Sequence, residues 1–565
     1  MGRFAACLAA IVGGIVLAIF ATTPPSPKGT TTALTAFSAG RAMSDVRQVA
    51  SAPHPTGSAE DAKVRDYLAA RMQALGMEVS SSSGGLVDAR GTAKYARWTG
   101  HAEPPKSLIN LIGVLPGRDR SLPAVMLMAH HDTVWGSPGA ADDTAGVAAT
   151  LEVVRAIRAG GQPQRDLVVL FTDGEELGLQ GARAFFASNP LRQRIGAIVN
   201  MEARGGGGRT AMFQTSPANG AAMALFARHV ARPSAGSLAV FLYRVLPNDT
   251  DLTPTLKGPY TSYNFAFIGR SALYHSPRAT PDRLDQGALQ DMGDQVLGLT
   301  QGLLSADSLP ARTQDVVFFD LFGLGLVIYP AWAGWIMLAL AALGLALVVR
   351  RNGSAGMGAG AGRMAGLIGI AAVLLYAFNW LSLKSGPPNY YDRLAAIPRL
   401  EALALLVSGA AVMLVMASWK PDKAGVAGAA LPLMVLAIVA QTLAPTAAYG
   451  VVVPLALLGL ALAAADRAPV PVGLGLLAGV GALVTGYMLA LAHFIMQGVG
   501  ATLPMAAAFP LAVAMLTLMP IWPKMPRRAA RLAGGVLLLA AAGLALSIHF
   551  APLADTVAAY SDTKR

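Results

Sequence analysis

Apolar and polar positions follow two different patterns along the chain. Between residues 58 and 304, apolar runs of five to seven residues alternate with longer stretches in which apolar residues recur every three or four positions. The short runs predict buried strands, and the following ranges fit: 108–114, 124–128, 167–172, 195–201 and part of 260–269. The longer stretches predict helices over 58–76, 144–159, 179–188, 218–230 and 286–304. This alternation predicts an α/β sandwich.

Longer apolar stretches lie on both sides of this region. Residues 4–22 are uncharged and apolar, which is typical of a signal peptide or an uncleaved anchor, and their length favours the anchor. After residue 315 we identify eight spans near membrane-crossing length, of which the fifth is marginal: 328–349, 364–383, 397–419, 426–443, 451–465, 470–495, 503–522 and 532–550.

These two patterns predict four parts of the chain. We expect an N-terminal signal anchor at 1–22, a linker at 23–51, an α/β domain at 52–312 and a polytopic domain of about eight transmembrane helices at 315–565. The lipid bilayer is therefore an expected partner.

Basic residues between the spans predict the orientation, because Lys and Arg accumulate on the cytoplasmic side. With the N-terminus inside, the inside segments hold Arg3, Arg350, Arg351, Arg363, Lys420, Lys423, Arg467, Lys524, Arg527, Arg528 and Arg531. The outside segments hold only Lys384, Arg393, Arg399, Lys564 and Arg565. This bias favours nine helices with an extracytoplasmic α/β domain, periplasmic or luminal according to the organism. The alternative is a cytoplasmic domain with every connection inverted.

Composition narrows the classes of function. The net charge is +12, yet residues 22–314 hold 28 Lys/Arg against 24 Asp/Glu, without a basic tract or an aromatic stacking motif. We therefore expect no nucleic-acid partner. Cys7 is the only cysteine, so no intramolecular disulfide can form.

Metal-ligand side chains follow the expected strands. His130 and Asp132 follow the strand at 124–128, and the remaining acidic and imidazole groups come at later element ends: Asp142, Glu175, Glu176, Glu202 and His275. In an open α/β sheet, ligands bind beyond the carboxyl ends of the strands. Each short motif alone is also what a solvated turn contains, but together they predict a metal site.

The residue types suit two metal ions. The two oxygens of Asp142 can bridge a pair of metals, whereas Asp143 can serve as a cap for the following helix. Of the adjacent pair Glu175-Glu176, one can bind metal while the other reaches a metal-bound water as a general base. Two imidazoles with three carboxylates suit paired Zn²⁺, although carboxylates also admit Mn²⁺ or Co²⁺.

Residues 52–304 resemble peptidase family M28, the di-zinc aminopeptidases. The resemblance is greater to the membrane-anchored branch of the endoplasmic reticulum metallopeptidase and vacuolar membrane protease type. It rests on HPTGSAEDAKVRDYL, AHHDTVWGSPGAADDTAGVAA, FTDGEELGLQGARAF, VNMEARGGGG, LPNDTDLTP and YHSPRATPDRLD. It implies a three-layer α/β/α sandwich with a mostly parallel mixed sheet.

The resemblance also implies roles for individual residues. One Zn²⁺ would be held by His130, Asp142 and Glu202, and a second by Asp142, Glu176 and His275. Glu175 would be the general base, and Asp132 would orient His130. His131 would only flank the site. Four further residues, Arg204, Asp249, Asp251 and Tyr274, lie near the matched motifs and either line the pocket or pack at the surface.

The expected function is a membrane-bound zinc metallopeptidase, an aminopeptidase that hydrolyses peptide substrates with a metal-activated water. An inactive peptidase-like ectodomain that serves as a receptor, a scaffold or a transporter accessory is the alternative. An inactive domain should have lost ligands, and all of the expected ligands are present. Carboxypeptidase or cyclase activity on the same fold also stays open.

Overall fold

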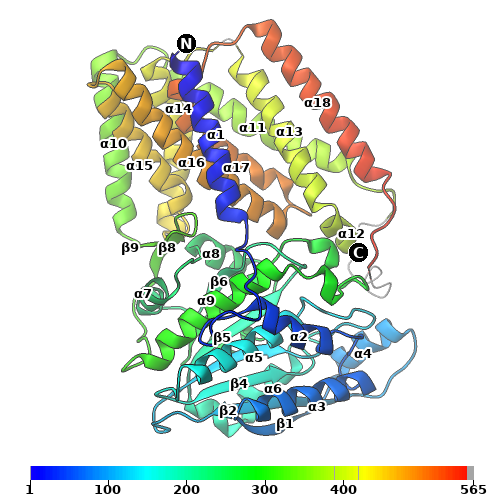
Figure 1. Cartoon of the computed structure of the whole chain (residues 1–565). Coiled ribbons are helices and arrows are strands. Elements are labelled where there is room, and N and C mark those ends of the chain that lie inside the picture. The colour runs from blue at the N-terminus through cyan, green and yellow to red at the C-terminus, as the bar shows by residue number, and fades with distance from the viewer. Residues whose placement is uncertain (1, 387–388, 418, 557–565) are drawn as a thin grey trace. The chain divides into compact units, whose positions relative to one another are not determined.

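The computed structural model describes residues 2–386, 389–417 and 419–556 (Figure 1). These residues form two compact units. The first contains Thr23–Ile328, Asn389–Ala395 and Ala554–Thr556, and the second contains the other described residues. The first unit therefore continues past residue 312, where we expected the α/β domain to end. Lys564 and Arg565, which entered the charge count, lie outside the described residues.

A seven-stranded sheet forms the centre of the first unit (Figure 1). Its strands are β1 (Glu78–Leu86), β2 (Ser107–Leu115), β3 (Ala124–His130), β4 (Leu167–Thr172), β5 (Ile195–Ala203), β6 (Ala211–Thr215) and β7 (Thr261–Phe267). They lie in the order β1-β2-β4-β3-β5-β7-β6. The four strands β4, β3, β5 and β7 are parallel, and β1, β2 and β6 add antiparallel pairs at the two edges. This arrangement confirms the expected mixed sheet.

Both faces of the central strands are buried. Val125 and Leu127 pack into a large core on one face, whereas Met126 and Met128 pack into a smaller core on the other. This alternation follows from the two-residue period of a strand, and parallel strands covered on both faces have the continuous apolar runs seen here.

Helices cover each face of the sheet (Figure 1). The larger core includes side chains of α2 (Ala39–Val49), α3 (Ala59–Ala74), α5 (Thr144–Ala159), α7 (Gly220–His229) and α9 (Gln286–Ser305). The smaller core includes Phe185 of α6 (Gln180–Ser188). The sequence pattern predicted all of these helices except α2. The structure has the bounds 144–159 and 167–172 as expected from the sequence.

Several elements were not predicted. They include α2, β1, β6, α4 (Ala89–Thr99), α8 (Ser237–Val245), α12 (Tyr390–Ala395) and a two-stranded sheet of β8 (Val316–Asp320) and β9 (Leu326–Pro330). β1 is an edge strand with a largely exposed Ser- and Gly-rich sequence, EVSSSSGGL, so it lacks the apolar alternation that marks a half-buried strand.

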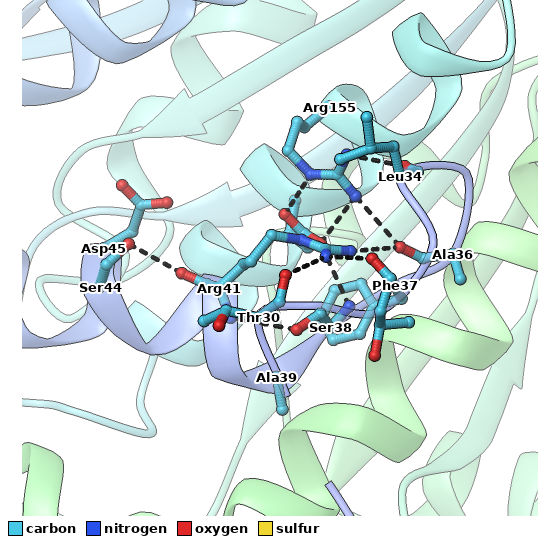
Figure 2. Close-up of polar contacts among 12 residues, drawn as sticks. Thr30, Leu34, Ala36, Phe37, Ser38, Ala39, Arg41, Ser44, Asp45 and Arg155 are labelled. Carbon is cyan, nitrogen blue, oxygen red and sulfur yellow. Dashed lines mark hydrogen bonds and ion pairs between the residues drawn. The ribbon is translucent and has the colours of Figure 1, made fainter. Parts of the chain in front are cut away.

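The stretch 23–51, expected as a linker, is held against α5. Phe37 is fully buried, and Glu152 of α5 accepts hydrogen bonds from the backbone N–H of Ser38 and from Arg41 Nε, at 3.1 and 2.8 Å. Arg155 donates to Glu152 and to the carbonyl oxygens of Leu34 and Ala36 (Figure 2). Residues 30–41 are therefore part of the folded unit.

The second unit is helical. Among the described residues, eight helical stretches are long and apolar enough to cross a membrane: α1 (Gly2–Thr22), α10 (Ala333–Asn352), α11 (Met357–Leu381), α13 (Ile397–Met416), α14 (Lys423–Leu443), α16 (Val470–Val499), the stretch Pro504–Ile521 around α17 (Ala508–Leu518), and α18 (Arg527–His549). A ninth, α15 (Tyr449–Ala465), is shorter. Every expected span coincides with one of these helices, including the marginal fifth.

Candidate metal centre

The predicted site residues come together beyond the carboxyl ends of the parallel strands. His130 ends β3, and Glu202 lies near the end of β5. Glu175 and Glu176 follow β4, and His275 follows β7 after a short loop. Parallel strands place their carboxyl ends at one edge of the sheet, which is why residues far apart in the chain meet here.

The first group of potential metal ligands consists of His130, Asp142 and Glu202. His130 Nε2 lies 3.1 Å from Asp142 Oδ1 and 3.8 Å from Glu202 Oε2. One ligand atom from each residue lies within 4.8 Å of the others. The structure thus brings together the three residues expected to hold the first metal.

The second group shares Asp142 with the first. His275 Nε2 lies 3.1 Å from Asp142 Oδ2 and 3.0 Å from Glu176 Oε1. The two oxygens of Asp142 therefore face different imidazoles, which is the arrangement that a bridging carboxylate needs. Burial opposes the ionisation of Asp142, but hydrogen bonds to His130 and His275 lower its pKa below the ordinary value.

Asp132 orients this site in a way that differs from the expectation. His130 Nδ1 donates to the backbone carbonyl of Asp132 at 2.9 Å, whereas the nearer carboxylate oxygen lies 3.5 Å away. Because a carbonyl can only accept, Nδ1 carries the proton and Nε2 presents its lone pair to the first group. The Asp132 carboxylate instead accepts the N–H groups of Glu175 and Glu176, at 3.0 and 3.3 Å. It also accepts the Thr56 hydroxyl at 3.2 Å.

Glu175 lies beside both ligand groups. Burial, the largest influence, raises its pKa well above the ordinary value, and the neighbouring carboxylates of Glu176, Asp251 and Asp142 act in the same direction against His130. A carboxylate with a raised pKa is better suited to hold a proton temporarily.

The donor set fits two divalent cations. Four carboxylates crowd around two imidazoles in a largely buried site, and repulsion among them raises the pKa of Glu202 in addition to the effect of burial. Glu202 Oε1 is buried and has no hydrogen-bond partner among the described residues. Two cations would offset this negative charge, and nitrogen with oxygen ligands suits Zn²⁺.

Neighbouring residues of the matched motifs have other roles. The Asp143 side chain accepts Gly146 N–H at 3.2 Å and caps α5, as the sequence indicated. The peptide bond between Asp142 and Asp143 is cis. Asp251 is fully buried and accepts a hydrogen bond from the Thr172 hydroxyl, so it does not pack at the surface.

His131 points away from the two ligand groups. Its Nδ1 lies 3.0 Å from Asp61 Oδ1, and its Nε2 donates to the carbonyl of Ile109 at 3.1 Å. Burial alone would lower the pKa of His131, but Asp61 and Asp173 raise it to about 9. His131 therefore lies among the carboxylates of Asp61 and Asp173, outside the expected site.

Two aromatic side chains border His275. The ring of Tyr274 stacks on the His275 ring with centroids 3.7 Å apart. The hydroxyl of Tyr391 lies 3.0 Å from His275 Nδ1. Sequence reasoning missed Tyr391, because it lies 116 positions after His275, beyond two apolar spans and in no recognised motif.

Residues 110–300 match the family model described as Peptidase family M28. The chain contains a peptidase M28 domain. All seven predicted site residues, from His130 to His275, lie within the matched range 110–300.

Curated relatives of the M28 domain are named as a metallopeptidase of the endoplasmic reticulum and a protease of the vacuolar membrane. The chain is 33% identical over 239 residues to endoplasmic reticulum metallopeptidase 1 of Mus musculus, covering 41% of this chain and 27% of that protein. It is 33% identical over 213 residues to the vacuolar membrane protease of Yarrowia lipolytica (strain CLIB 122 / E 150), covering 38% and 21%. The matches thus span about a quarter of the length of these relatives.

Among solved structures, the chain is similar to an aminopeptidase from Aneurinibacillus sp. strain AM-1. The sequence identity is 15% and the TM-score is 0.39, and the match covers 50% of this chain and 99% of that one.

Proposed function

We propose that the chain is a membrane-bound di-zinc metallopeptidase that acts as an aminopeptidase on peptides. The observation that carries this proposal is the pair of ligand groups joined by Asp142, with Glu175 beside them. His130, Asp142 and Glu202 would hold one Zn²⁺, and Asp142, Glu176 and His275 the other. Bound zinc would lower the pKa of a water molecule and polarise the scissile carbonyl.

Glu175 would move the proton during hydrolysis. Its carboxylate takes a proton from the attacking water and gives it to the nitrogen of the leaving amine. The Asp132 carboxylate holds the backbone of the Glu175-Glu176 turn through two hydrogen bonds, so both glutamates keep their positions relative to His130. Asp132 therefore supports both the base and a metal ligand.

We also propose that the peptidase domain lies on the extracytoplasmic side. The distribution of Lys and Arg supports this orientation. Asn389–Ala395 and Ala554–Thr556 belong to the same compact unit as the sheet, and the predicted order of spans also places these segments on the same side of the membrane as the sheet. The charge distribution alone favours the outside for all three.

The test uses the whole chain purified in detergent. We expect about two zinc ions per chain and hydrolysis of aminoacyl chromogenic substrates that is lost when the substrate amine is acetylated. Glu175→Gln should lower kcat by about 10²- to 10⁴-fold without loss of zinc, because it removes only the proton acceptor. Glu60→Gln, which changes an exposed glutamate paired with Lys63, is the matched control and should retain activity.

Three results would contradict the proposal in different ways. A folded, zinc-free and inactive chain would favour the receptor or scaffold alternative. Equal cleavage of acetylated substrates would refute the aminopeptidase assignment alone. Full activity in Glu175→Gln would refute the role of Glu175.

A further inference from the structure

A short helix from the C-terminal part of the sequence belongs to the peptidase unit. α12 (Tyr390–Ala395) lies in the connection between α11 and α13, yet Asn389–Ala395 groups with the sheet. The Asn389 side chain accepts the N–H of Asp392 at 3.1 Å and so caps the start of this helix. At its other end, the carbonyl of Leu394 accepts the Ser271 hydroxyl at 2.9 Å. α12 is therefore hydrogen-bonded to the loop that leads to His275.

Tyr391 extends from α12 to the ring of His275. Its side chain is buried, with 3% of the residue exposed, and its hydroxyl oxygen lies 3.0 Å from His275 Nδ1. The other ring nitrogen, Nε2, faces Asp142 and Glu176. If Nε2 binds a metal, Nδ1 must carry the proton and needs an acceptor, and Tyr391 Oη is in position to be that acceptor.

The backbone of His275 gives this contact added importance. His275 has φ = 51°, in the left-handed region that a residue with a Cβ rarely adopts. Such a conformation persists only when surrounding contacts hold it. Tyr274 stacks on one side of the ring, the Tyr391 ring lies with its centroid 5.5 Å away, and the Thr556 hydroxyl donates to the His275 carbonyl at 3.1 Å.

The chain from Ala554 adds to the same support. Asp392 of α12 accepts the N–H of Ala554 at 3.0 Å, and the carbonyl of Asp555 accepts the Ser276 hydroxyl at 2.6 Å. Two segments that follow apolar helices thus converge on one metal ligand. His130 requires no contact from a distant segment, because the acceptor for its Nδ1 is the carbonyl of Asp132, two residues away.

We propose that Tyr391 is a positioning residue for His275, so that the connection between α11 and α13 completes the second metal site of the peptidase domain. This inference rests on the proposed function in that it requires metal at His275. It assigns to the C-terminal half of the chain a direct part in forming the site. An outer hydrogen-bond partner of a metal-binding imidazole typically changes metal affinity by about 10- to 100-fold.

The experiment measures zinc affinity in the whole chain in detergent, by competition with a chelator. His275→Ala identifies which of the two dissociation constants belongs to the His275 site. Tyr391→Phe keeps the ring and its packing but removes the oxygen. We expect it to raise that dissociation constant by about 10- to 100-fold and to leave the other unchanged. Tyr390→Phe is the matched control, since it removes the neighbouring hydroxyl from the same helix, and both constants should stay at the wild-type values.

The thermal midpoint of the zinc-free chain separates positioning from folding, and we expect Tyr391→Phe to leave it unchanged. Wild-type affinity at both sites in Tyr391→Phe would overturn the inference while leaving the proposed function intact. A lower kcat with both zinc affinities unchanged would overturn it as well. If the wild-type chain binds no zinc, the inference and the proposed function fail together.

Discussion

The two imidazoles of the candidate centre are oriented by different kinds of acceptor. For His130 the acceptor is the backbone carbonyl of Asp132, two residues away. For His275 the proposed acceptor is the side-chain oxygen of Tyr391. A backbone acceptor survives any substitution at its own position, whereas a phenol does not, so the two ligands differ in their sensitivity to mutation.

Asp320 of β8, which belongs to neither ligand group, provides a test of buried charge. Burial raises its pKa to about 6, against the opposing effects of Arg209 and of the N–H groups of Gly323 and Ala235. An unfolded aspartate titrates near about 3.9. The folded state therefore holds this proton more tightly, and the associated stability is present below about pH 4 and lost as the pH rises to about 6.

Replacing Asp320 with Asn should remove that dependence. We expect Asp320→Asn to raise the thermal midpoint at pH 8 by several degrees relative to wild type and to have little effect near pH 4, because the ionised form no longer has to be buried. Thermal unfolding of both chains across this range checks the prediction. An equal shift at both pH values would show that hydrogen bonding, not charge, accounts for the difference.

At the scale of elements, apolar periodicity and turn residues predicted most of the helices and strands that surround the site. The run 167–172 is wholly apolar except for Thr172, and 144–159 begins with a capping Asp143, so both elements were found with their ends. α8 and β6 lie in a region where short elements are joined by polar loops, and the pattern there was too brief to identify them.

The sequence located the site residues because the carboxyl ends of parallel strands meet at one edge of the sheet. The contact between Tyr391 and His275 could not be predicted, because it depends on α12 belonging to the same unit as the sheet, which the sequence pattern does not indicate.

The packing of α1 against α16 depends on glycine. A Cβ added to Gly14 would come within 3.0 Å of Thr485 Cβ and 3.1 Å of the Gly486 nitrogen. Small residues at such positions allow two apolar helices to approach closely. The N-terminal helix thus has a specific partner among the C-terminal helices.

Gly14→Val should separate these two helices. We expect a thermal midpoint lower by several degrees, because the added side chain overlaps Thr485 and Gly486. Gly366→Val in α11 is the control, since nothing lies within 4 Å of a Cβ at that position. Comparable losses in both variants would indicate a general cost of valine in an apolar helix.

At the scale of the whole molecule, the membership of the compact units constrains the number of membrane crossings. Asn389–Ala395 and the chain from Ala554 belong to the same unit. Between them lie α13, α14, α15, α16, the stretch Pro504–Ile521 and α18. Six crossings return the chain to its starting side, but five do not. α15, with only 17 residues, must therefore cross as well if the other five do.

Cysteine labelling tests this count in a Cys7→Ser background. Ser385→Cys and Thr446→Cys should react with a membrane-impermeant thiol reagent on intact cells, and Arg467→Cys should react only after permeabilisation. The reason is that Thr446 and Arg467 lie at opposite ends of α15. Labelling of both from the same side would show that α15 does not cross.

The position of Tyr391 in the chain sets an order of events during biosynthesis. His275 leaves the ribosome 116 residues before Tyr391. At about 5–20 residues per second, this distance corresponds to about 6–23 s of translation. During that interval α10 and α11 are also made. If Tyr391 positions His275 as proposed, the second metal site can be completed only after these helices have been synthesised. The newly made peptidase domain would thereby stay immature until part of its membrane anchor is in place.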